Sequence, residues 1–161
     1  MSTFRQFQIS GLPAAPFAPL FEMSSAELER IGARRVVAEA SDGYPCRVSL
    51  ADVAAGEELV LFSYEHQPAP GSPYRATGPI FVSRRAKESD LPPGELPPCV
   101  EKRLMSVRAY DAQHLIVDAD VCEGADLPPV IERLFADPQV AYLHLHNARR
   151  GCYSCRVDRV A

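Results

Sequence analysis

The sequence has no tryptophan, only three methionines and no long run of apolar residues. Its longest uninterrupted apolar runs are four residues, at 59–62 and 140–143, whereas a membrane-spanning helix needs about 20. The first ten residues, MSTFRQFQIS, also lack the apolar core of a secretory signal. We therefore expect a cytoplasmic protein that does not contact a membrane.

An excess of positive charge is also missing. Lysine and arginine total 17 against 21 aspartates and glutamates, which gives a formal net charge of −4. No basic stripe with interleaved aromatic residues is visible, although such a stripe is typical of nucleic-acid binding. Nucleic acid is therefore not an expected partner.

The cysteine and proline contents match neither a disulfide-rich protein nor a low-complexity protein. The five cysteines are odd in number, in a chain of 161 residues, which disfavours a disulfide framework and predicts free thiols. The 15 prolines and 9 glycines make up about 15% of the chain, below the roughly 25–30% of low-complexity sequences. Length and composition predict a single domain over residues 1–161.

Hydrophobic alternation and capping signals predict short strands and few helices. Among these signals, Ser24 and Glu27 fit a capping box at the start of a helix. Residues 11–19 contain three prolines and are expected to be irregular. Residues 104–111 and 114–121 are expected to form a hairpin. This inventory indicates an α+β fold with a mainly antiparallel or mixed sheet of about eight strands and about three helices. Strands are predicted at 4–9, 34–40, 58–64, 79–82, 104–111, 114–121, 140–146 and 152–160, and helices at 25–31, 49–55 and 126–135.

The densest group of reactive side chains lies in HLHNARRGCYSC, residues 144–155. His144 and His146 are two residues apart, so they share one face of a strand. A hairpin with a five-residue loop would pair His146 with Cys152 and His144 with Ser154, and this register keeps polar and apolar residues on separate faces.

Three interpretations of this polar face remain open. It is a solvated sheet face, or a transition-metal site formed by His144, His146 and Cys152, or a nucleophile pair in which His146 and Cys152 are catalytic. His66 and His114 lie alone in or near loops and are expected to be surface residues.

Arginines beside proline- and glycine-rich turns form a second candidate site. Arg47 follows Tyr44-Pro45-Cys46, and Arg75 follows Ser72-Pro73-Tyr74. A guanidinium binds a carboxylate or phosphate through two parallel hydrogen bonds. The alternative is that these arginines pair with acidic residues across the sheet.

Three stretches carry a resemblance to a known family: GYPCRVSLADVAAGEELVLFSYEHQP, SPYRATGPIFV and HLHNARRGCYSCRVDR. On these motifs the chain resembles the DUF1203 family, bacterial proteins of unknown function, from about residue 7 to residue 159. The resemblance implies a bacterial, intracellular, single-domain protein and implies no reaction. Cys155 does not belong to the family pattern.

Because the family-like segments lie far apart in sequence, we hypothesise that they converge on one pocket. The best prediction of function is a small-anion-binding protein, and the alternative is a Cys/His-dependent or metal-dependent enzyme acting on a small anion. A transition metal is the one cofactor considered. The expected ligand-binding residues are Cys46, Arg47, Tyr74, Arg75 and Asn147, beside the catalytic candidates His146 and Cys152.

Overall fold

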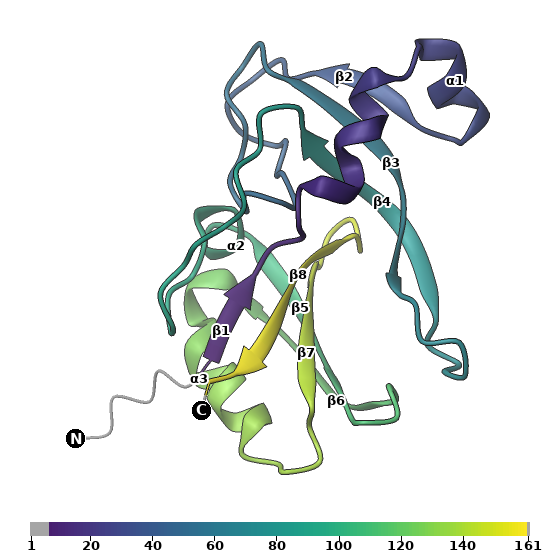
Figure 1. Cartoon of the computed structure of the whole chain (residues 1–161). Coiled ribbons are helices and arrows are strands. Elements are labelled where there is room, and N and C mark those ends of the chain that lie inside the picture. Colours follow the sequence, from purple (N-terminus) through teal and green to yellow (C-terminus); the bar gives the residue numbers. More distant parts are fainter. Residues whose placement is uncertain (1–6, 161) are drawn as a thin grey trace.

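The computed structural model describes residues 7–160, and in this range eight strands form two antiparallel sheets (Figure 1). The larger sheet has the strand order β1-β8-β7-β5-β6, made of Phe7–Ser10, Tyr153–Arg159, Tyr142–Asn147, Leu104–Tyr110 and Ile116–Glu123. The smaller sheet has the order β2-β3-β4, made of Arg34–Val37, Glu58–Gln67 and Ala76–Ser83. The predicted α+β class with short strands and few helices is confirmed.

The helices are short, and in the described residues they lie at Ala15–Glu22 (η1), Ser25–Arg30 (α1), Pro98–Glu101 (α2), Gly124–Asp126 (η2) and Leu127–Phe135 (α3). The predicted capping box starts α1: Ser24 accepts from the Glu27 amide, and the Glu27 carboxylate accepts from the Ser24 amide. None of these helices has the length and apolar character needed to cross a bilayer.

One face of the larger sheet packs on α3, which presents Leu127, Ile131 and Leu134 at helical spacing. These side chains meet alternate residues of the central strands, such as Val107 and Leu145. The periodicities of the helix and the strands therefore combine to build the main core.

The opposite face of the larger sheet is covered by the β3–β4 hairpin, which runs down beside β7 and β8 (Figure 1). Rings of Tyr64 and His66 on β3 lie 6.2 and 5.5 Å from the ring of Tyr153. His144 and His146 are only 4% and 1% exposed. The interpretation of their face as solvated is therefore wrong, because a second sheet encloses it.

An irregularity in β8 changes the predicted register. Leu145 pairs with Cys155 and His146 with Tyr153, so Ser154 is an extra residue in β8. Such a bulge turns the chain beyond it onto the other face. Tyr153 therefore lies beside the histidines rather than in the main core, and His144 pairs with Arg156 rather than Ser154.

Two other expectations about local structure are wrong, and one short helix was not expected. Residues 15–22 are a 3-10 helix rather than irregular, because the φ that proline fixes suits such a turn. Residues 49–55 are not helical, since the chain folds back and the Cys46 amide bonds to the Ala51 carbonyl. The short helix α2 was not predicted. Residues 4–6 of the first predicted strand lie outside the described residues.

Candidate anion-binding pocket and histidine cluster

The turn at residues 45–52 carries Arg47 into the interior. The Arg47 amide donates to the Phe81 carbonyl on β4, and the Arg47 carbonyl accepts from the Leu12 amide. Leu50 closes the turn with a left-handed backbone, at a φ of 58°. Arg47 is therefore fixed at its backbone by two separate segments of the chain.

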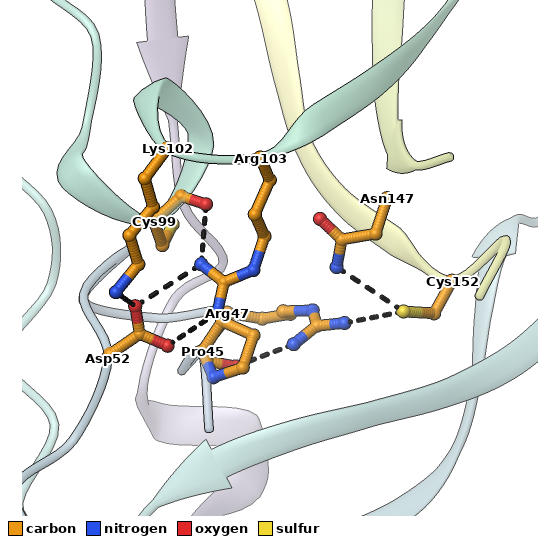
Figure 2. A network of polar contacts seen from close by, with 8 residues as sticks. All are labelled: Pro45, Arg47, Asp52, Cys99, Lys102, Arg103, Asn147 and Cys152. Carbon is orange, nitrogen blue, oxygen red and sulfur yellow. Dashed lines mark hydrogen bonds and ion pairs between the residues drawn. The ribbon is translucent and has the colours of Figure 1, made fainter. Parts of the chain in front are cut away.

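The guanidinium of Arg47 is buried, and the whole residue is only 2% exposed. Its Nε donates to the Tyr153 carbonyl at 2.7 Å. Nη1 donates to the Pro45 carbonyl, and Nη2 donates to Sγ of Cys152 at 3.2 Å (Figure 2). No carboxylate among the described residues forms an ion pair with it. A buried charge without a counter-charge is unfavourable, so this site favours an anion.

The β7–β8 turn places Asn147 and Cys152 beside this guanidinium. Gly151 adopts a φ of +82°, which an L side chain rarely adopts. Its amide donates to the Asn147 carbonyl at 2.7 Å, and the Asn147 amide donates to the Cys152 carbonyl at 2.9 Å. Asn147 Nδ2 lies 3.4 Å from Sγ of Cys152, so two N–H groups point at the sulfur (Figure 2).

These residues line a pocket of about 560 Å³, within the range of about 300–1,000 Å³ typical of small-molecule sites. Tyr44 and Phe81 supply aromatic surface. Among the described residues, the lining includes five cations and one acid, Glu123. The cations are Arg47, Lys102, Arg103, Arg149 and Arg150.

Asp52 neutralises part of this charge from behind the pocket. Its Oδ1 accepts from Arg103 Nη2 at 2.8 Å, and its Oδ2 is paired with Lys102 (Figure 2). Burial alone would raise the pKa of Asp52, but the bonds from Arg103 and Lys102 outweigh it and hold the pKa below its usual value. Asp52 balances only one of the two cations Lys102 and Arg103, so a net positive charge remains on this pair. Among the described residues, no ion pair involves Arg47, Arg149 or Arg150.

A second hollow of about 270 Å³ contrasts with this pocket. Its lining includes both acidic and basic side chains, and Glu58 pairs within it with Arg84. Its charges therefore already neutralise one another.

A cluster of three histidines lies between the two sheets. One ring nitrogen from each of His66, His144 and His146 lies within 4.8 Å of those of the other two. The Tyr153 ring stacks on His66 with an interplanar angle of 6° and meets the other two rings by its edge. His66 lies in a bulge of β3 between Tyr64 and Gln67. Tyr64 and His66 are two residues apart on this strand, so their side chains point toward the same face of the sheet.

Burial keeps the cluster uncharged. Desolvation lowers the pKa of His144 and of His146 to about 3, and it also lowers the pKa of His66. The nearby charge of Arg108 lowers all three further. The rings are therefore neutral at physiological pH, which leaves each with one nitrogen lone pair.

The expected convergence of the family-like segments holds for some residues only. Arg47, Asn147 and Cys152 meet at the pocket. Tyr74 and Arg75 do not line the pocket. Arg75 instead forms an ion pair with Glu65 at 3.2 Å, as expected if this arginine pairs with an acidic residue rather than with a ligand. Cys46 is fully buried in an apolar cluster, where its sulfur accepts from the Ser83 amide.

The expected partnership of His146 with Cys152 is not seen as a hydrogen bond. Nδ1 of His146 faces the Gly151 carbonyl at 3.0 Å, and Nε2 of His146 has no partner in the part of the chain that the structure describes. Cys152 instead contacts Arg47 and Asn147. His66 takes the place beside His144 and His146 that the metal-site interpretation gave to Cys152.

The sequence reasoning missed His66 and the two basic residues that follow α2, Lys102 and Arg103. Phe62, Tyr64 and His66 alternate along one predicted strand, so a strand extended by two residues would have placed His66 on an aromatic face. Lys102 and Arg103 gave no comparable signal, because they follow a helix that was not predicted.

The sequence profile of a family described as a protein of unknown function (DUF1203) matches residues 43–159. The chain belongs to the DUF1203 family. The residues of the pocket and of the histidine cluster lie within the matched range, and the family's description assigns no activity. No curated protein and no solved structure matches the chain.

Proposed function

We propose that the protein binds a small anionic molecule in the pocket around Arg47. The observation that carries this proposal is the buried guanidinium of Arg47, which lacks a carboxylate partner among the described residues. Two carbonyls and one sulfur use three of its five N–H groups. A carboxylate or phosphate would supply the missing charge and accept from the remaining donors.

The pocket walls define the class of ligand further. Arg149 and Arg150 are exposed at the rim, where they attract an anion without first being desolvated. Tyr44 and Phe81 offer surface to an apolar or aromatic group. The expected ligand therefore combines one phosphate or carboxylate with a small apolar body.

Phenyl phosphate is a suitable probe, with phenol as its uncharged counterpart. We expect phenyl phosphate to raise the melting temperature of the chelator-treated protein, and phenol to leave it unchanged. The R149A/R150A variant should lose most of the shift, because both residues line the pocket. R75A is the matched control, since Arg75 is exposed and lies outside the pocket. Loss of the shift in R75A but not in R149A/R150A would overturn the proposal.

A thiol-dependent enzyme acting on the same anion is the second candidate. It is favoured by the position of Cys152, whose sulfur lines the pocket and accepts from Arg47 and Asn147. With an acyl ester, the Cys152 sulfur would attack the acyl carbon, the ester C–O bond would break, and the alcohol would leave with the thiol proton. A thioester would then remain on Cys152. Intact-mass measurement after incubation with an anionic acyl ester would detect that adduct in the wild type, and its absence would leave binding alone.

A further inference from the structure

We propose that His66, His144 and His146 form a binding site for a divalent transition-metal ion of the zinc class. The proposal is independent of anion binding at the pocket. It begins with three buried ring nitrogens that have no hydrogen-bond partner within residues 7–160: Nδ1 of His66, Nδ1 of His144 and Nε2 of His146. Each unpaired buried polar atom costs about 1–3 kcal/mol. One ring nitrogen of each of these histidines lies within 4.8 Å of those of the other two, close enough for one metal ion to be shared among the rings.

The tautomer of His146 suits a metal ligand. A carbonyl oxygen can only accept, so the neutral ring donates from Nδ1 to the Gly151 carbonyl at 3.0 Å. The lone pair of Nε2 then points away from this bond and has no other partner. Backbone carbonyls commonly fix metal-binding histidines in this way.

The distances between the histidine nitrogens are longer than those in a zinc-bound site. Two nitrogens bound to one tetrahedral zinc at 2.0–2.1 Å lie about 3.3 Å apart, whereas the histidine nitrogens lie within 4.8 Å of one another. Binding a metal ion would therefore require the rings to turn about their side-chain torsions and bring the nitrogens closer. Because His66 comes from β3 and the other two from β7, the ion would join the two sheets.

The donor set selects the class of metal. Three imidazoles without a carboxylate suit zinc, cobalt, nickel or copper and not magnesium or calcium. The charged groups acting on the cluster are arginines: Arg108, Arg47 and Arg156. They weaken binding of a cation, and they favour a bound water or anion in the fourth position that three histidines leave open.

Cobalt provides the test, because tetrahedral Co²⁺ absorbs visible light and replaces zinc. We expect the apo protein to bind one equivalent of Co²⁺ with a visible absorption band that one equivalent of Zn²⁺ abolishes. H66A should bind more weakly by over ~100-fold, beyond the 10–100-fold typical of losing an outer partner. His66 is only partly buried, so H66A should fold, which its melting curve will check.

Two variants distinguish this site from other possible sets of metal ligands. H114A is the matched control, since His114 is the one histidine of the chain outside the cluster, and it should bind Co²⁺ as the wild type does. C152A tests the alternative set of His144, His146 and Cys152. Retained binding in H66A, or no stoichiometric binding by the wild type, would overturn the proposal. It would also be overturned if the wild type showed a near-ultraviolet sulfur-to-cobalt band and C152A lost binding.

Discussion

Nη2 of Arg47 lies 3.2 Å from Sγ of Cys152, and this contact joins a turn of the first third of the chain to the β7–β8 turn. The same guanidinium donates from Nε to the buried carbonyl of Tyr153. One side chain thus fixes the wall of the pocket and supplies its positive charge. Substitution of Arg47 should therefore affect both stability and anion binding.

R47K keeps the charge but loses the planar fork of donors. Because the carbonyl of Tyr153 would lose its partner, we expect R47K to lower the free energy of unfolding by about 1–3 kcal/mol. Urea denaturation measures this change. R149K is the control and should be neutral, because Arg149 is exposed. Equal stability of the two variants would contradict the structural role given to Arg47.

Two thiols differ in their electrostatic surroundings and should react differently with an anionic reagent. Cys152 lies among the pocket arginines. Burial and the charges of Asp120, Asp126 and Glu123 raise the pKa of Cys122. We expect the dianionic Ellman reagent to label Cys152 faster than Cys122 at low salt. Added salt should reduce the difference between the two labelling rates, because it screens the charges. C152S and C122S variants identify each phase, and faster labelling of Cys122 would contradict the charge distribution.

D52N tests the ion pairs behind the pocket. Its loss of charge-assisted bonds to Arg103 and Lys102 should cost about 2 kcal/mol at neutral pH. The folded-state pKa of Asp52 lies below its ordinary value of 3.8. Its contribution to stability is therefore present above pH 3.8 and is lost as the pH falls through the folded pKa. The gap in unfolding free energy between wild type and D52N should therefore be constant at neutral pH and shrink below pH 3.8. A gap that widens in acid would reverse the sign of this linkage.

Gly124 tests the support of the pocket from the side of α2. A Cβ atom at this position would lie 1.8 Å from the Val100 carbonyl oxygen and 2.9 Å from that of Arg103, both backbone atoms. G124A should therefore destabilise the protein by about 3 kcal/mol or more, and it should weaken anion binding because Lys102 and Arg103 would shift. G71A is the control, since a Cβ on Gly71 meets nothing within 4 Å. Equal melting temperatures of the two variants would contradict this packing.

Much of the fold follows from local patterns that the sequence displays. The capping box at Ser24 and Glu27, the hairpin of β5 and β6, and the helix after Asp126 all form as predicted. Each depends on neighbouring residues or on strict alternation, which are visible along the chain.

The candidate site was harder to predict from the sequence. Its geometry depends on a bulge in β3, a bulge in β8 and the contact between the two sheets. The extra residue Ser154 moves Tyr153 onto the face of His146, and no composition signal marks such a bulge. His66 reaches the cluster only because the β3–β4 hairpin folds over the larger sheet. The periodicity of residues along the chain does not reveal contacts between segments so distant in sequence.

The central claim is that the pocket around Arg47 binds a small anion, and chemical-shift mapping by NMR tests it most directly. On titration of chelator-treated protein with phenyl phosphate, we expect the largest shifts at the Nε–H of Arg47 and at the amides of Asn147 and Cys152. The hairpin end with Glu65 and Arg75 should not respond, and phenol should cause no comparable change. Shifts centred on Arg75, or no saturable shift at Arg47, would contradict the account.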